Sequence, residues 1–135
     1  MADLIVVDAS VLYEVITAGP LAPAATAALA SAHDHAAPEI IDVEVTGLIR
    51  RDAQHHVLDG TRSQWALDRL RDWPGDRFPH RPFIRRVWHL RENVRTTDAF
   101  YVALAEALDV PLMTLDGRLA RASGVNCQVL VPGDE

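Results

Sequence analysis

The stretch LIVVD, residues 4–8, is a continuous run of apolar, mostly β-branched side chains that ends in an aspartate. Such unbroken runs are typical of strands that are covered on both faces, as in parallel sheets. A second run, residues 110–115, ends at Asp116, and a shorter one covers residues 129–131. We therefore expect a parallel sheet with aspartates where two strands end, at the sheet edge where such folds place their sites.

Helical patterns fill most of the chain between these strands. We expect helices at residues 10–17, 23–31, 40–56, 83–91, 97–108 and 118–122, and another that is capped by Ser63 and carries Trp65 and Leu70. Residues 33–35 are predicted as a turn and residues 73–82 as a loop rich in Pro and Gly. The alternation of strands and helices predicts an α/β fold with three layers, α/β/α, and a central, mainly parallel sheet.

Length and composition indicate an ordinary globular chain. With 135 residues, 49% of them hydrophobic and 24% charged, residues 1–135 are expected to form one domain, and disordered or collagen-like classes are excluded. The single cysteine, Cys127, excludes an internal disulfide and a thiolate zinc site, and we expect it to be buried. The apolar run near the N-terminus is too short for a signal peptide or a membrane span, so we expect a soluble cytoplasmic protein with no membrane partner.

Charge is distributed unevenly along the chain. Its net charge is −6, and all thirteen basic residues are arginine. Residues 50–95 hold eleven of them against six acids, whereas both flanks are acidic. An acidic protein has a low non-specific affinity for nucleic acid. The basic segment 50–95 nevertheless permits a local phosphate-binding face. The candidates for RNA-phosphate contact are Arg50, Arg51, Arg86 and Arg95. Each of them is equally compatible with a solvated helix surface.

Four carboxylates stand out, three of which have a simple local explanation. Asp8, Asp98 and Asp116 lie where a helix begins, and each is compatible with a capping role. Glu44 is different, because at 100° per residue it lies about 60° from Ile41, at the border of the face that must be buried. A carboxylate there is costly unless it is paired, for example with Arg51, or bound to a cation.

Taken together, these carboxylates predict a metal site. Asp8 and Asp116 follow neighbouring parallel strands, and the other two acids lie on helices that can pack beside that sheet edge. Converging carboxylates repel one another and need divalent cations, and hard oxygen ligands favour Mg²⁺ or Mn²⁺ over zinc. Such a site activates water for phosphodiester hydrolysis without a protein nucleophile. The predicted catalytic and metal-binding residues are Asp8, Glu44, Asp98 and Asp116, with supporting hydroxyls from Ser10 and Thr114.

Histidines and tryptophans offer weaker functional signals. The pairs His33/His35 and His55/His56 lack cysteine partners, and we expect them on the surface rather than in a zinc site. Tryptophans can stack on bases, but those at helical positions among aliphatic residues are more often core. We therefore expect Trp65 and Trp88 to be buried and Trp73, in the predicted loop, to be exposed.

Four blocks occur together in one order: VVDAS at residues 6–10, Pro38 followed by Glu44 and Arg50-Arg51, TDAFYVALAE at residues 97–106, and LMTLD at residues 112–116. In these blocks the chain resembles the PIN-domain ribonucleases, and most closely the VapC toxins of bacterial toxin–antitoxin pairs. The resemblance spans nearly the whole chain. One departure is that Thr96-Thr97 precedes Asp98 where many members have a tyrosine.

The resemblance implies a Mg²⁺- or Mn²⁺-dependent endoribonuclease that cleaves RNA, often tRNA or rRNA. It also implies a homodimer and a cognate antitoxin that wraps the toxin. Carried over to this chain, the acidic quartet of the family is Asp8, Glu44, Asp98 and Asp116.

Other functions fit the residues less well. A phosphorylatable receiver domain needs a lysine near its phosphate, and this chain has none. A haloacid-dehalogenase-type phosphatase needs a second Asp two residues after the first, where this chain has Ser10. Two alternatives stay open: a non-catalytic protein- or RNA-binding α/β module, and a housekeeping RNA-processing nuclease.

Overall fold

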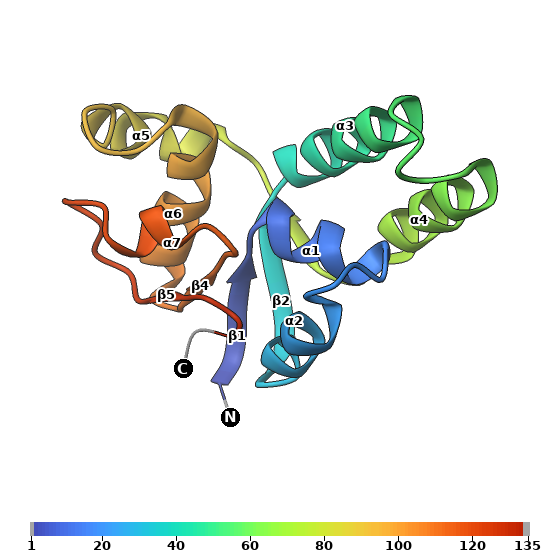
Figure 1. The fold of residues 1–135 in the computed structure, drawn as a ribbon. Helices are drawn as coiled ribbons and strands as arrows, with labels where there is room; N and C mark the ends of the chain where they lie inside the picture. The colour runs from blue at the N-terminus through green and yellow to red at the C-terminus, as the bar shows by residue number, and fades with distance from the viewer. Residues whose placement is uncertain (1, 134–135) are drawn as a thin grey trace.

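The computed structural model describes residues 2–133 and contains one five-stranded sheet (Figure 1). All strand pairings in it are parallel, and the strand order is β3-β2-β1-β4-β5. The three-layer α/β/α architecture with a parallel sheet is thereby confirmed. The strands are β1 (Ala2–Val7), β2 (Ala32–Pro38), β3 (Asp76–Phe78), β4 (Leu112–Met113) and β5 (Val129–Leu130).

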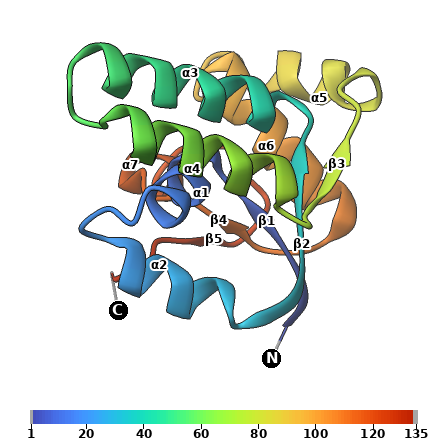
Figure 2. The ribbon, with the colours of Figure 1, turned by 90° about the vertical axis from the view of Figure 1, so that its right-hand side faces the viewer.

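Helices cover both faces of this sheet. In Figure 1, α1 to α4 lie on one side of strands β1 and β2, and α5 and α6 lie on the other. Figure 2 shows α3 and α4 running next to each other, and the two helices are in contact. The helices are α1 (Ala9–Ile16), α2 (Ala22–Leu29), α3 (Ile40–Gln54), α4 (Gly60–Asp72), α5 (Ile84–His89), α6 (Thr96–Leu108) and α7 (Gly117–Ala120), with a 3₁₀ turn at Arg81–Phe83.

The central strand β1 explains why the sheet forms around the LIVVD stretch. Ile5, Val6 and Val7 are at most 1% exposed, because helices cover the strand on both faces. From β1 the chain first adds β2 and β3 on one side and later adds β4 and β5 on the other. The strand order therefore reverses next to β1, and ligand sites of open α/β sheets lie at such a reversal, beyond the carboxyl ends of the strands.

Two segments that the sequence pattern assigned to a turn and a loop are strands. His33 and Asp34 lie within β2 and are exposed, and the Asp34 position pairs with Leu4 of β1. The prediction of a turn was wrong because backbone pairing with β1 outweighs the low strand propensity of these side chains. Strand β3, at the sheet edge, was missed for a similar reason: it has only three residues and pairs with the end of β2.

Helix α4 begins four residues earlier than predicted. Asp59 is its N-cap, and its Oδ1 accepts a hydrogen bond from the Arg62 amide at 2.7 Å. Ser63 lies inside the first turn and donates from Oγ to the Asp59 carbonyl. The assignment of Ser63 as the cap was wrong because Asp59 is an equally good capping residue and precedes it.

The tryptophans are also distributed differently from the prediction. Trp65 and Trp88 are 55% and 62% exposed, so their assignment to the core was wrong. Each is covered instead by an arginine guanidinium, Arg69 at 4.4 Å and Arg91 at 4.3 Å from the ring centre. Trp73, which we expected to be exposed, is half-buried. Cation–π stacking allows an aromatic ring to remain at the surface of a helix.

Other surface expectations hold with two exceptions. His33, His55 and His56 are exposed, whereas His35 is half-buried and its Nε2 lies 2.9 Å from the Leu29 carbonyl oxygen. Cys127 is half-buried rather than fully buried, and this burial raises the pKa of its thiol to about 11. Among the described residues, no helix combines the length and the apolar character that crossing a membrane requires.

Arg86 anchors the C-terminal segment to α6. Its Nε and Nη2 donate to the two carboxylate oxygens of Glu106 at 2.6 and 2.9 Å, and Nη2 also donates to the Gly124 carbonyl. The Asn126 amide donates to Glu106 as well, at 2.8 Å. Arg86, a predicted candidate for RNA-phosphate contact, is thus bound to Glu106 near the C-terminal end of α6, whereas Asp98 lies in the first turn of that helix.

Glu106→Gln is expected to lower the free energy of unfolding by about 2 kcal/mol at neutral pH, since hydrogen bonds to charged groups contribute roughly 1.5–3 kcal/mol. Burial alone would raise the pKa of Glu106, but Arg86 and the Asn126 amide lower it below its ordinary value of 4.5. The contribution is therefore complete above the unfolded-state pKa and is lost as the pH falls through the lower folded-state pKa. Urea unfolding of both proteins at about pH 7 and about pH 3 measures it. An equal difference at the two pH values would contradict the assignment.

Candidate active site

Asp8 lies where β1 passes into α1 and is 8% exposed. Its Oδ2 accepts hydrogen bonds from the Ser10 hydroxyl at 2.6 Å and the Thr114 hydroxyl at 3.0 Å. The Ser10 oxygen in turn accepts the Leu115 amide at 3.1 Å. These bonds tie the end of β1 to the segment that follows β4, so the two predicted supporting hydroxyls do contact a predicted site carboxylate.

Asp116 is joined to the same network through Thr114. The Asp116 amide donates to Thr114 Oγ1 at 3.0 Å, and Thr114 itself is fully buried. Asp116 caps α7, and its carboxylate accepts two hydrogen bonds from the Arg118 guanidinium at 3.1 and 3.2 Å. Arg118, which lies two residues after the acid, was not among the residues that sequence reasoning singled out.

Glu44 lies on α3 and is half-buried, as its position on the helical wheel predicted. Its partner is not Arg51, which pairs with Asp52 at 3.0 Å. Instead, Glu44 Oε1 accepts a hydrogen bond from the Tyr101 hydroxyl at 2.7 Å, and Tyr101 is 0% exposed. Sequence reasoning gave Tyr101 no role. The available signal was one hydroxyl-bearing residue in an apolar stretch of helix, three positions after Asp98.

Asp98 lies in the first turn of α6, and its side chain is 17% exposed. Arg95 donates from Nε to Asp98 Oδ2 at 3.2 Å. Asp98 and Asp116, together with Arg95 and Arg118, line one cavity of about 200 Å³ beside α6 and α7. This cavity thus brings together two of the predicted carboxylates and the two exposed arginines that neutralise them.

Three of the acids influence one another electrostatically. Burial raises the pKa of Asp8, the Ser10 and Thr114 hydroxyls oppose that rise, and the charge of Asp98 adds to it. Burial likewise raises the pKa of Glu44, the Tyr101 hydroxyl lowers it, and the charges of Asp8 and Asp98 raise it further. Asp116 differs, because its hydrogen bonds with Arg118 hold the pKa of its carboxyl below the usual value. Asp8, Glu44 and Asp98 therefore form one cluster of mutually repelling charges.

The donor set of this cluster fits a hard divalent cation. Carboxylate oxygens and hydroxyls, with no cysteine or histidine beside them, are the ligands that suit Mg²⁺ or Mn²⁺. A cation would also offset the repulsion that raises the pKa values of Asp8 and Glu44. Within residues 2–133, however, no three His, Cys, Asp or Glu side chains converge closely enough to enclose an ion, and Asp98 and Asp116 are paired with Arg95 and Arg118.

The four candidate arginines have different surroundings. Arg95 lies beside the acidic cluster and is 74% exposed on its side chain. Arg50 is exposed on α3. Arg51 and Arg86 are held by Asp52 and Glu106, respectively, rather than by the site carboxylates. Arg95 is therefore the candidate whose position suits a phosphate beside the carboxylates.

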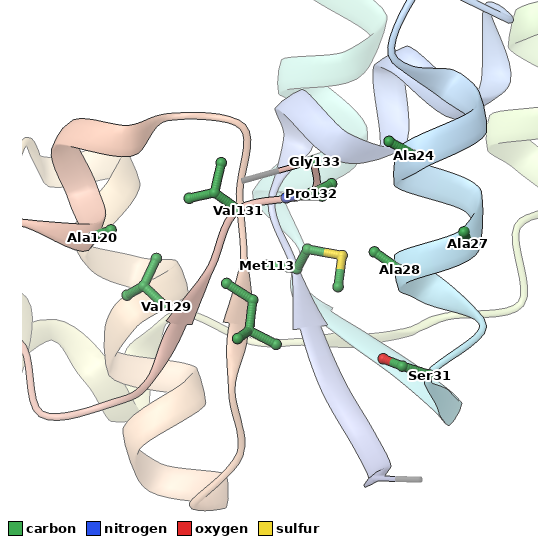
Figure 3. A pocket seen from close by; sticks show the side chains of 11 residues that line it. Ala24, Ala27, Ala28, Ser31, Met113, Ala120, Val129, Val131, Pro132 and Gly133 are labelled. Carbon is green, nitrogen blue, oxygen red and sulfur yellow. The ribbon is translucent and has the colours of Figure 1, made fainter. Parts of the chain in front are cut away.

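A larger cavity lies away from these groups. It measures about 620 Å³ and is formed by α2, β5 and the segment after β5 (Figure 3). Figure 3 shows Met113 between Ala28 of α2 and Val129 of β5. Among the residues that the structure describes, no charged side chain lines this cavity, and none lines both it and the cavity of Asp98 and Asp116. Of the four predicted site carboxylates, only Asp98 and Asp116 line a cavity, and it is the smaller of these two.

Comparison with known proteins shows the family to which the chain is similar. Residues 5–125 match the PIN domain family. The chain is 45% identical over 94 residues to ribonuclease VapC1 of Mycobacterium tuberculosis, covering 69% of this chain and 71% of the relative. It is 36% identical over 126 residues to ribonuclease VapC12 of the same organism, covering 93% and 97%. FitAcB from Neisseria gonorrhoeae has the same fold, with a TM-score of 0.72 over 97% of this chain and 99% of that one at 18% identity.

Because the family match covers most of the chain, it shows the family directly. The chain belongs to the PIN-domain family. Within that family it belongs with the VapC ribonucleases, as the resemblance in its sequence blocks predicted. The alternative of a non-catalytic binding module is thereby set aside.

Proposed function

We propose that this protein is a divalent-metal-dependent endoribonuclease that cleaves tRNA or rRNA, with Mg²⁺ or Mn²⁺ held by Asp8, Glu44, Asp98 and Asp116. That it is an RNA-cleaving toxin of the VapC type follows from its family. The metal, the ligand residues and the class of RNA are the proposal. The observation that carries it is the buried Asp8, which lies within electrostatic reach of Glu44 and Asp98 at the carboxyl end of the central strand.

The residues around this carboxylate have separable tasks. Ser10 and Thr114 hold one oxygen of Asp8 and so fix its orientation. Thr114 also binds the Asp116 amide, which keeps that acid at the same sheet edge. When bound, a divalent cation lowers the pKa of its water and offsets negative charge on the phosphate. The protein therefore needs no nucleophilic side chain of its own.

Arg95 and Arg118 are suited to the RNA backbone. Both guanidinium groups are largely exposed and line the cavity that Asp98 and Asp116 share. Guanidinium groups bind phosphate through paired hydrogen bonds, which fixes the backbone as well as attracting it. An RNA strand that approaches the carboxylates thus meets positive charge first.

Membership of this family supports a proposal for the partners. VapC toxins pair with antitoxins, and a solved relative of the same fold, at 17% identity, is described as FitAB bound to an IR36 DNA fragment. For this chain we propose a cognate antitoxin protein, a homodimer and a place in the cytoplasm, where its RNA substrates are found.

Induced expression of the chain in a bacterial host is expected to arrest growth within a few generations, and co-expression of the small protein encoded beside it is expected to restore growth. Sequencing of RNA ends after brief induction should reveal new ends in tRNA or rRNA. Normal growth together with unchanged RNA ends would contradict the proposal. RNA cleavage by the purified protein without growth arrest would instead favour the housekeeping nuclease.

A further inference from the structure

Tyr101 has the one polar side chain among the buried residues of α6. It is 0% exposed and is surrounded in its helix by alanine, valine and leucine. A tyrosine buried in this way needs a hydrogen-bond partner for its hydroxyl, because an unpaired polar group in an apolar interior is costly. That partner is a carboxylate of the proposed site.

The hydrogen bond joins two helices that each contribute an acid. From α6, Tyr101 donates to Glu44 Oε1 on α3 at 2.7 Å, across 57 positions of sequence. Asp98 precedes Tyr101 by three positions, and side chains three apart in a helix lie on the same face. The same face of α6 therefore supplies one acid directly and holds another through the tyrosine hydroxyl.

The two carboxylates held by hydroxyls share a pattern. Asp8 accepts its hydrogen bonds from Ser10 and Thr114 through Oδ2, and Glu44 accepts its bond through Oε1. In the part of the chain that the structure describes, Asp8 Oδ1 and Glu44 Oε2 make no hydrogen bond or ion pair. Each acid thus has one oxygen fixed by a neutral donor and one oxygen left over.

We propose that Tyr101 is a positioning residue of the ribonuclease: it fixes one oxygen of Glu44 so that the other oxygen is presented to the divalent cation. The inference rests on the proposed function, in which Glu44 is a metal ligand. Carboxylates that bind metal ions are themselves commonly held by hydrogen bonds, and loss of such a partner typically costs about 10–100-fold in metal affinity or activity.

Tyr101→Phe removes the hydroxyl and keeps the ring. The Mn²⁺ concentration that gives half-maximal RNA cleavage is expected to rise by roughly 10–100-fold. A second measurement does not depend on catalysis. The Mn²⁺ concentration at the midpoint of the metal-dependent rise in melting temperature should increase by a similar factor.

The chain offers a matched control, because it has only two tyrosines. Tyr13 of α1 also donates a hydrogen bond to a carboxylate of α3, that of Asp52. Tyr13→Phe removes the same hydroxyl and the same kind of hydrogen bond to a carboxylate of α3. Its acceptor, Asp52, lies about two helical turns from Glu44. Tyr13→Phe is expected to lower the melting temperature without metal and to leave both Mn²⁺ midpoints unchanged.

A double variant tests whether Tyr101 acts through Glu44. In a Glu44→Gln background, which keeps an acceptor oxygen but removes the charge, the further change Tyr101→Phe should no longer shift the Mn²⁺ midpoint of the melting temperature. An equal shift in both backgrounds, an unchanged midpoint in Tyr101→Phe, or an equal shift in Tyr13→Phe would each overturn the inference. The two failures can be told apart. Full RNA cleavage by Asp8→Asn would contradict the proposed function, whereas an unchanged Mn²⁺ midpoint in Tyr101→Phe would contradict only the role of Tyr101.

Discussion

Asp8→Asn is expected to abolish RNA cleavage while the protein stays folded. The metal charge that this carboxylate helps to hold is worth several kcal/mol of transition-state stabilisation, and each 1.36 kcal/mol is tenfold in rate, so the loss should be on the order of 10³-fold or more. Initial rates on a labelled RNA at saturating Mn²⁺ measure it. Cleavage at a rate near that of the wild type would remove Asp8 from the mechanism.

The same variant should be more stable than the wild type when no metal is present. Asparagine is as good an N-cap as aspartate, and its side-chain oxygen can still accept from the Ser10 and Thr114 hydroxyls. The substitution removes a buried charge and its repulsion with Asp98. A matched control is Asp59→Asn, which changes the capping aspartate of α4 far from the carboxylates and should leave cleavage unchanged.

Mn²⁺ is expected to raise the melting temperature of the wild-type protein substantially. A ligand that binds only the folded state stabilises it by about 2.7 kcal/mol at 100 times its Kd. For a chain of this size that corresponds to a rise of roughly 10 °C. The melting temperature is measured at a series of Mn²⁺ concentrations and at constant ionic strength.

Two variants test whether the ion binds at the predicted carboxylates. Glu44→Gln should shift the metal-dependent rise to much higher Mn²⁺ concentrations, whereas Glu106→Gln, whose carboxylate is held by Arg86, should leave the Mn²⁺ dependence unchanged although its melting temperature without metal is lower. A melting temperature that is unchanged by Mn²⁺ up to millimolar concentrations, or a rise that survives in Asp8→Asn, would contradict a metal site at this sheet edge.

The parts of the fold that could be predicted from the sequence are those that local pattern decides. The run from Leu4 to Val7 must be covered on both faces, and it is the central strand. The wheel position of Glu44 correctly indicated a half-buried carboxylate. By contrast, β2 and β3 depend on pairing with a distant strand, which side-chain propensity does not encode.

The details that the sequence did not predict are mostly choices between partners. Arg51 and Arg86 each had several acids within reach along the chain, and only the packing of the helices decides that Asp52 and Glu106 bind them. The hydrogen bond between Tyr101 and Glu44 spans α3 and α6, so no local spacing indicates it. Trp88 was misjudged because Arg91 stacks on its ring while most of the side chain stays exposed, and local spacing does not indicate this arrangement.

The order of the strands determines when, during synthesis, the residues around Asp8 can come together. Asp8 is translated among the first residues, but β4 enters the sheet beside β1 only after residues 112–113 have been added. Thr114 and Asp116 follow β4 directly, so the hydroxyl that holds Asp8 arrives with the last fifth of the polypeptide. A chain that ends before β4 therefore lacks both the Thr114 hydroxyl bond to Asp8 and the Asp116 carboxylate, and under the proposed function we expect such a chain to be inactive.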